Sequence, residues 1–318
     1  MSGGGGGGVH VAILMATRNG AAFLSEQLES IAAQDHRNWS LTVSDDGSSD
    51  ATRDIVAAFA ARHPGYRVAL RDGPGSGSTA NFLSLIAAAG GRAGLIALSD
   101  QDDIWLPDKL SRAAAVLSPF ASQPALYGAR TILADRAGRA TGLSPLFRRP
   151  PSFGNALVQS IAGGNTMVLN AGAAALAGEL AGAALAPGGR LPACHDWWLY
   201  QLVTGAGGTV IYDPRPALLY RQHDGNQIGA NRSARARARR LSLLLQGRFA
   251  RWNDLNLAAL EAARPFLTEA ARERIGDFRR LRHRRGPAAL AALARAGLVR
   301  QTAAGTLSLA VGAALGKL

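Results

Sequence analysis

Cysteine is almost absent from this chain of 318 residues, because Cys194 is its single thiol. One cysteine excludes an internal disulfide framework, and its surroundings lack the spacing of a thiol-ligated metal site. We therefore expect a protein of a reducing compartment, the cytoplasm, in which Cys194 serves in packing.

Long apolar runs are missing as well. A helix that spans a bilayer needs roughly 20 apolar residues, and the best candidate, 302–316, is too short. Residues 3–8 are six glycines, which lack the basic start and the apolar stretch of an export signal. We expect 1–8 to form a flexible tail, and the protein to be free in the cytoplasm or bound peripherally at the inner face of the cell membrane.

Acidic residues are scarce beside basic ones, which gives a formal net charge of +13. Arginines crowd into 232–240 and 279–285, whereas the clustered aspartates fall mostly in the first hundred residues. Basic clusters of this kind bind nucleic acid or anionic lipid, or form a solvated helix face. The chain has no DNA- or RNA-recognition motif and few aromatic residues in these stretches. We therefore expect no nucleic-acid partner and keep a basic nucleic-acid-binding protein as a distant alternative.

The first hundred residues alternate short apolar runs with helical patterns. Runs at 9–16 and 94–99 predict buried strands, 39–44 and 66–71 predict two further strands, and apolar positions three or four residues apart between them predict helices. This alternation predicts an α/β fold with a Rossmann-like, mostly parallel sheet flanked by helices. In such sheets the loops after the strands meet at one crevice, where ligands bind.

The parallel pattern ends after about residue 117. We expect the following elements there: a hairpin of 131–134 and 141–146, a strand at 166–170, a helix at 195–204, and two short strands at 209–212 and 217–221. Beyond about residue 230 only helical periodicity is visible. The sequence thus predicts an α/β domain over 9–230 and a basic helical C-terminal region over 231–318.

The strongest chemical signal is the segment Ser99-Asp100-Gln101-Asp102-Asp103, whose three carboxylates directly follow a predicted buried strand. Magnesium and manganese prefer such oxygen ligands and complete their shell with phosphate oxygens, so the segment is suited to hold a diphosphate. The alternative is an acidic turn that caps the next helix.

A second acidic segment, Asp45-Asp46-Gly47-Ser48-Ser49-Asp50, ends an earlier predicted strand. Its structural interpretation is helix capping. Two adjacent carboxylates before a glycine exceed what a cap needs, and an aspartate at a strand end accepts hydrogen bonds from a nucleobase or a ribose. We favour nucleoside binding.

Three segments together resemble the family 2 glycosyltransferases: Ala16-Thr17-Arg18-Asn19-Gly20, Ser44 to Asp50, and Asp100-Gln101-Asp102-Asp103. The continuation to Ile104-Trp105, with Asn81-Phe82 upstream and His195-Asp196-Trp197-Trp198 downstream, is most similar to the rhamnosyltransferase-like branch. The resemblance covers about residues 9–230. It implies the fold called GT-A, here with a helical C-terminal extension.

The resemblance implies specific roles for residues of the donor site. Five residues are implied in nucleotide binding: Thr17, Asp45, Asp46, Asp100 and, as a weaker candidate, Arg71. Asp102 is the implied ligand of a magnesium or manganese ion, with Asp103 as the alternative and His223 as a further ligand. Arg221 is a candidate for bidentate pairing with the diphosphate.

It further implies that Asp196 is the catalytic base. Inverting transfer needs a base that takes the proton from the acceptor hydroxyl while the metal stabilises the leaving diphosphate. Trp197 and Trp198 would form a wall for the acceptor sugar, and Asn165 lies where the acceptor pocket would begin. Without the resemblance, Asp196 reads as a helix amino-terminal carboxylate and the tryptophans as core residues.

The sequence therefore predicts an inverting, metal-assisted glycosyltransferase that acts on a glycan or lipid-linked saccharide in cell-surface polysaccharide synthesis. We expect dTDP-L-rhamnose as the donor, with a UDP-hexose as the alternative. The basic C-terminal helices are expected to contact the membrane, although a dimer contact or a lid would use the same features. An inactive relative is disfavoured because the required acids are present, and the acids cluster unlike the separated pair of a glycoside hydrolase.

Overall fold

The computed structural model of the chain describes residues 8–92, 94–223 and 247–318. Of the predicted tail only Gly8 belongs to these residues. The expected domain boundary near residue 230 and the arginine cluster at 232–240 lie outside them.

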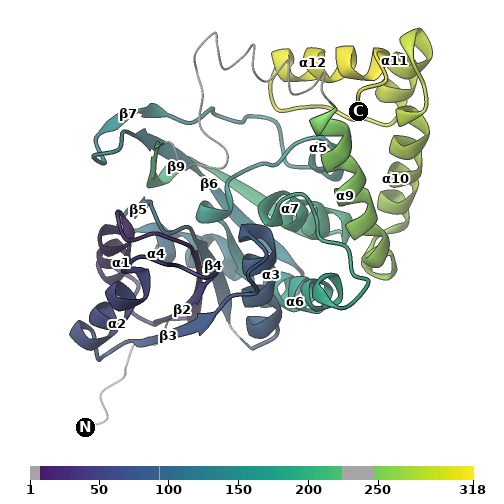
Figure 1. Cartoon of the computed structure of the whole chain (residues 1–318). Coiled ribbons are helices and arrows are strands. Elements are labelled where there is room, and N and C mark those ends of the chain that lie inside the picture. The colour runs from purple at the N-terminus through teal and green to yellow at the C-terminus, as the bar shows by residue number, and fades with distance from the viewer. Residues whose placement is uncertain (1–7, 93, 224–246) are drawn as a thin grey trace.

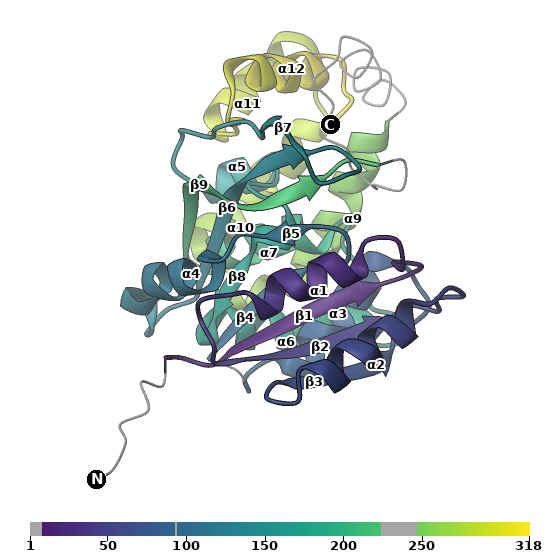
Figure 2. The ribbon, with the colours of Figure 1, turned by 90° about the vertical axis from the view of Figure 1, so that its left-hand side faces the viewer.

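The first hundred residues form alternating strands and helices, as the sequence predicts. The elements are β1 (Val11–Thr17), α1 (Leu24–Ala32), β2 (Trp39–Asp45), α2 (Thr52–Arg62), β3 (Arg67–Asp72), α3 (Ser78–Ala89) and β4 (Leu95–Ser99). The strands pair in parallel in the order β3-β2-β1-β4. Parallel pairing brings the carboxyl ends of these strands to one edge of the sheet, shown in Figure 2.

The second half of the sheet is mixed. Its strands are β5 (Ile104–Trp105), β6 (Ala125–Ala134), β7 (Ala140–Leu143), β8 (Val168–Asn170) and β9 (Thr209–Arg221). They extend the order as β4-β8-β6-β9-β5, and β7 forms the predicted hairpin with β6. Only β6 and β9 pair in parallel here. The end of the parallel pattern after β4 is thus confirmed.

Strand β9 differs from the prediction because it joins the two expected short strands. Pro214 and Pro216 lack the amide hydrogen that a ladder needs, which favours an interruption in the sequence-based reading. The structure accommodates them with register shifts against β6, and the Arg215 amide donates to the Asp213 carboxylate over 2.9 Å. The strand therefore continues through a local irregularity.

Helices cover both faces of the sheet, as Figures 1 and 2 show. The helices of the middle of the chain are α4 (Lys109–Leu117), α5 (Phe153–Ala156), α6 (Ala171–Leu185) and α7 (His195–Gly205). One apolar cluster joins the sheet to α1, α2 and α4, and a second joins its other face to α3, α6 and α7. The helix α6 was not anticipated from the sequence.

Within residues 247–318 the chain forms the α-helices α9 (Arg248–Ala262), α10 (Glu269–Arg282), α11 (Gly286–Arg295) and α12 (Ala303–Ala314). The helical prediction is confirmed for the part of this region that the structure describes. The second apolar cluster includes side chains from all four helices, so they share a core with α6 and α7. None of the described helices combines the length and the apolar character needed to cross a bilayer.

Candidate active site

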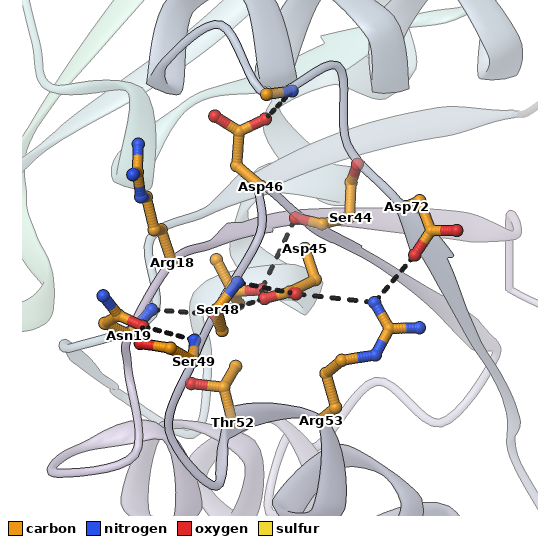
Figure 3. Close-up of polar contacts among 12 residues, drawn as sticks. Arg18, Asn19, Ser44, Asp45, Asp46, Ser48, Ser49, Thr52, Arg53 and Asp72 are labelled. Atoms are coloured by element: carbon orange, nitrogen blue, oxygen red, sulfur yellow. Dashed lines mark hydrogen bonds and ion pairs between the residues drawn. The ribbon is translucent and has the colours of Figure 1, made fainter.

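The ends of β1 and β2 bring Thr17 and Asp45 side by side, since the two residues are partners in the parallel register. The Thr17 hydroxyl donates to Asp45 Oδ1 over 3.2 Å, and the Ser48 amide donates to Oδ2 over 3.1 Å. Arg53 Nη1 lies 3.4 Å from the same Oδ2. Figure 3 shows Ser48 and Arg53 around Asp45.

The environment of Asp45 keeps its carboxyl group ionised. Burial raises the pKa of Asp45, but hydrogen bonds from Ser48, Thr17 and Arg53 lower it by more. The pKa of Asp45 therefore lies below its usual range. A charged acceptor at the end of a strand suits the predicted contact with a nucleoside. That role stays a prediction.

Asp46 is engaged in building a loop. Its Oδ1 accepts a hydrogen bond from the Gly75 amide at 2.7 Å, and its Oδ2 accepts one from the Gly77 amide at 2.8 Å. Both glycines have a positive φ, 67° and 91°, which favours glycine at these positions. The carboxylate of Asp46 therefore fixes the loop between β3 and α3, and both its oxygens are used.

The loop after β1 is held by residues that the sequence reasoning did not single out. The Gln101 side chain accepts from the Arg18 amide at 2.9 Å and donates to the Arg18 carbonyl at 3.1 Å. Asn19, with a φ of 49°, accepts from the Ser49 amide at 2.8 Å. Gln101 thus ties the acidic loop after β4 to the loop after β1. The dipeptide Asn19-Gly20 is a sequence signal that could have found this turn, because asparagine adopts a positive φ more readily than most residues.

Arg71 lies on the face of β3 toward α3. Its guanidinium reaches the carbonyl and the hydroxyl of Ser84 at 3.4 Å and 3.5 Å. Among the described residues it makes no hydrogen bond or ion pair with Asp45 or Asp46. Its predicted contact with the nucleotide therefore has the weakest geometric support in the set.

Three carboxylates converge beyond β4. Burial is the main cause that raises the pKa of Asp100 to about 7, and the nearby negative charges of Asp102 and Asp196 raise it as well. Asp196 opens α7, far along the chain from the other two. The structure therefore brings the predicted metal-binding segment and the predicted catalytic base into one cluster.

Asp102 is paired with a histidine from the end of β9. His223 Nε2 lies 2.8 Å from Asp102 Oδ2, and the two side chains are 12% and 16% exposed. The imidazole ring also packs against Phe23, with 4.8 Å between the ring centres. The two residues that the resemblance implies as metal ligands are thus adjacent and accessible.

Asp103, the alternative metal ligand, is fully buried. Its Oδ2 accepts a hydrogen bond from Asn165 Nδ2 at 2.6 Å. Lys109 Nζ donates to the Asn165 carbonyl at 2.8 Å and lies 3.0 Å above the Trp105 ring. Burial and the charges of Asp100 and Asp102 raise the pKa of Asp103 well above its usual range, and burial lowers the pKa of Lys109.

The burial of Asp103 favours Asp102 as the metal ligand, and that assignment stays a prediction. A metal ion that also binds the diphosphate of the donor needs a protein ligand that solvent can reach. Asp103 is not accessible to solvent in this conformation. Asn165 likewise directs its amide to Asp103 and not to an acceptor. The hydrogen bond between Asn165 and Asp103 thus stabilises the acidic loop after β4.

The surroundings of Asp196 raise the pKa of its carboxyl group. Burial raises its pKa to about 6, although the backbone amides of Trp197 and Gly164 donate to it and lower the value. The Trp197 amide lies 2.7 Å from Asp196 Oδ1. A pKa of about 6 leaves the group ionised near neutral pH and makes it a stronger base than an ordinary aspartate.

The two tryptophans after Asp196 are packing residues in this conformation. Trp197 and Trp198 are 5% and 1% exposed, so neither presents a ring to solvent as an acceptor wall would. The Trp197 indole donates to the Ala156 carbonyl, and its ring lies 6.1 Å from Phe249 and 6.4 Å from Trp252 of α9. The structural interpretation of these residues thus fits the geometry better than the predicted wall.

Arg221 holds the end of β9 in place. Its Nε donates to the Asp102 carbonyl at 3.0 Å, its Nη1 donates to the Arg136 carbonyl at 2.7 Å, and its Nη2 pairs with Glu26. The side chain is buried. These contacts and its burial commit the guanidinium to protein groups.

The donor set fits a divalent cation only in part. No group of three or more His, Cys, Asp or Glu side chains arranged to hold a metal occurs within residues 8–92, 94–223 and 247–318. Asp102 and His223 supply one carboxylate and one imidazole. Magnesium and manganese sites with phosphate ligands commonly use one or two protein carboxylates, so the pair fits an ion that also binds a diphosphate and water.

Comparison with known proteins identifies the family of this chain. The model of "Glycosyl transferase family 2" matches residues 12–127. A dTDP-rhamnosyl transferase, RfbG of Shigella flexneri, is 30% identical over 241 residues, which cover 72% of this chain and 78% of the relative.

Solved structures share the fold at low sequence identity. One is S. aureus TarS 1-349 in complex with UDP-GlcNAc, with a TM-score of 0.53 and 17% identity over 84% of this chain and 70% of that one. Another is the mannosyltransferase PcManGT of Pyrobaculum calidifontis in complex with GDP-Man and Mn2+, with a TM-score of 0.50 and 19% identity over 97% and 80% of the two chains. With its strand-end carboxylates, its α/β sheet and a relative matched over most of both lengths, the chain belongs to glycosyl transferase family 2 and has the GT-A fold.

Proposed function

We propose that this glycosyltransferase moves L-rhamnose from dTDP-L-rhamnose to a glycan or lipid-linked saccharide, with inversion at the anomeric carbon. The observation that carries the proposal is the convergence of Asp100, Asp102, Asp196 and His223 at one edge of the sheet. The likeness to a dTDP-rhamnosyl transferase supports the choice of donor. A UDP-hexose remains the alternative donor, supported by the shared fold of a protein solved with UDP-GlcNAc.

The residues after β1 and β2 form the nucleoside side of the proposed site. Asp45, kept ionised by its hydrogen bonds, would accept from the pyrimidine or the ribose, with Thr17 orienting the carboxylate. Asp46 would act by holding the glycine loop that closes this side. Asp100 would face the ribose.

Asp102 and His223 would hold a magnesium or manganese ion. When bound, such an ion stabilises the negative charge of the leaving diphosphate. Arg221 fixes the backbone of Asp102 and the end of β9, and so keeps the two ligand side chains adjacent.

Asp196 would be the base of the transfer. The acceptor oxygen attacks the anomeric carbon as the bond to the diphosphate oxygen breaks, and Asp196 takes the proton of the attacking hydroxyl. The raised pKa of Asp196 lies closer to the neutral pH of the cytoplasm than the pKa of an ordinary aspartate does. We place the enzyme in the cytoplasm, with residues 9–230 as the transferase domain and 231–318 as an appended helical region.

Two measurements identify the nucleotide and the sugar of the donor separately. Calorimetric titration with dTDP and UDP, each with manganese and with chelator, ranks the nucleotides and tests the metal. Incubation with dTDP-rhamnose or UDP-glucose and a panel of saccharide acceptors, read by mass spectrometry, then gives the sugar. Binding of neither nucleotide would overturn the proposal, and metal-dependent binding of UDP alone would select the alternative donor.

A further inference from the structure

Helix α12 exposes a continuous apolar face. Leu307, Val311 and Leu315 are 67%, 43% and 51% exposed, and their spacing of four residues places them on one side of the helix. Leu309 and Ala313 are buried on the opposite side, where α12 packs on α11. Figures 1 and 2 both show α12 at the end of the molecule farthest from α2 and β3.

The composition of this helix is unusual for a helix at the surface. Its sequence, AAGTLSLAVGAA, contains no charged residue. A surface helix normally turns a polar or charged face to water. A contiguous exposed apolar face marks a place of contact with another surface, in contrast to single exposed leucines.

The C-terminal helices carry positive charge that carboxylates compensate only in part. No aspartate or glutamate follows Asp277 in the sequence. The basic residues that follow it are Arg279, Arg280, Arg282, Arg284, Arg285, Arg295, Arg300 and Lys317. Arg284, Arg285 and Arg295 are exposed, and no carboxylate of the described residues pairs with them. Arg285 lies beside the end of α12, where a Cβ added to Gly316 would be 3.0 Å from its Nε.

The combination of features selects one kind of partner. A nucleic acid would satisfy the arginines but leave the leucines in water, and a second copy of the same face would bring like charges together. A bilayer with anionic headgroups accepts both, because apolar side chains enter the headgroup boundary while arginines meet the phosphates. The length of α12, 12 residues, suits a helix that lies in the plane of the membrane.

We propose that α12 docks this protein on anionic lipid bilayers, with Leu307, Val311 and Leu315 inserted and Arg284, Arg285 and Arg295 on the headgroups. The proposal is independent of the transfer chemistry, since it uses none of the residues of the active site. It assigns a function to the charge asymmetry of the C-terminal helices.

Vesicle co-sedimentation of the full chain tests the docking. We compare vesicles of phosphatidylcholine alone with vesicles that contain phosphatidylglycerol, and the triple variant Leu307→Gln/Val311→Gln/Leu315→Gln with the wild type. The expected result is binding to anionic vesicles only, weakened about tenfold or more in the variant and in Arg284→Gln/Arg285→Gln/Arg295→Gln. Leu255→Gln is the matched control, because Leu255 is 42% exposed on α9 and should leave binding unchanged.

A fluorescent label reports insertion without relying on the triple variant. In a Cys194→Ser background, Val311→Cys carries an environment-sensitive dye whose emission should shift to the blue on anionic vesicles. The same dye at Leu255→Cys should not shift. Absence of binding to anionic vesicles, equal binding by the triple variant, or a concentration-dependent dimer that the triple variant abolishes would each overturn the proposal.

Discussion

His223 Nε2 lies 2.8 Å from Asp102 Oδ2, although the two residues are separated by 121 positions in the sequence. The contact joins the loop after β4 to the residue that follows β9 by two positions. It gives the proposed donor site a nitrogen and an oxygen ligand at one point. The first prediction below rests on this pair.

Removing either partner should weaken metal-dependent binding of the nucleotide. We expect Asp102→Asn and His223→Gln each to raise the Kd of dTDP in manganese by about tenfold or more, because each removes a ligand of the ion. In chelator the variants and the wild type should bind alike. Calorimetry measures both conditions. Asp108→Asn is the control, since Asp108 is an exposed carboxylate nearby, and an equal loss there would contradict the assignment.

The rate of transfer should follow the ionisation of Asp196. A base must be deprotonated to act, so kcat should rise with pH around a midpoint near the pKa of Asp196, about 6, and not near the ordinary aspartate value. Asp196→Asn should lower kcat by roughly 10²- to 10⁴-fold and leave the Kd of dTDP nearly unchanged. Glu179→Gln, at an exposed position of α6, is the control for charge. A wild-type rate that is already independent of pH at pH 5 would rule out this base.

Stability should fall below pH 6.5 because of His195. Its ring stacks on Phe82 at 3.9 Å, and burial lowers its pKa to about 3. In the unfolded chain the pKa of His195 is near 6.5. As the pH falls below that pKa, His195 binds a proton in the unfolded chain but not in the folded protein. The contribution of His195 to stability is therefore present above pH 6.5 and is lost below it. The loss is roughly 1.4 kcal/mol per pH unit, or about 2 kcal/mol at pH 5.

A variant without this titration isolates the effect. His195→Gln should be less stable than the wild type at pH 7.5, but its free energy of unfolding should decline less between pH 6.5 and pH 5. Urea unfolding followed by circular dichroism measures the difference. Parallel pH profiles for the two proteins would show that His195 accepts a proton in the folded state.

The buried amine of Lys109 should stabilise the acidic loop. Lys109→Met removes the buried amine that donates to the Asn165 carbonyl and faces Asp103 and Asp100, and we expect a loss of roughly 1 to 3 kcal/mol. The double variant Lys109→Met/Asp103→Asn should recover part of this loss, because it also removes the buried carboxyl group that the amine faced. Denaturant unfolding of the four proteins completes the cycle. Lys317→Met serves as the control, and strictly additive losses in the cycle would contradict the coupling.

Much of the fold could be predicted because its signals are local. The runs that became β1 and β4 are apolar on nearly every residue, as expected of strands buried on both faces, and β2 shows the apolar–polar alternation of a strand. Helix α6 gave no such signal, since Ala171–Leu185 is rich in alanine and glycine and has hardly any polar face. Its packing explains that composition: a Cβ at Gly178 would lie 2.7 Å from the Gly90 Cα beyond α3.

The site could be predicted only to the level of which residues gather there. Strand ends and the family motif brought forward Thr17, Asp45 and Asp102, because the loops after parallel strands share an edge. The sequence did not show which partner each of the neighbouring aspartates contacts. Asp102 faces a histidine and Asp103 an asparagine because the chain turns between them, and a turn of this kind depends on tertiary contacts with Lys109 and Asn165.

The buried guanidinium of Arg221 carries a consequence for the speed and strength of donor binding. It is tied at once to the Asp102 carbonyl, the Arg136 carbonyl and Glu26, so the strand that leads to His223 is fixed before any ligand arrives. A site assembled in advance loses little conformational entropy on binding. The histidine is thus preorganised against the acidic loop by an arginine that need never touch the substrate.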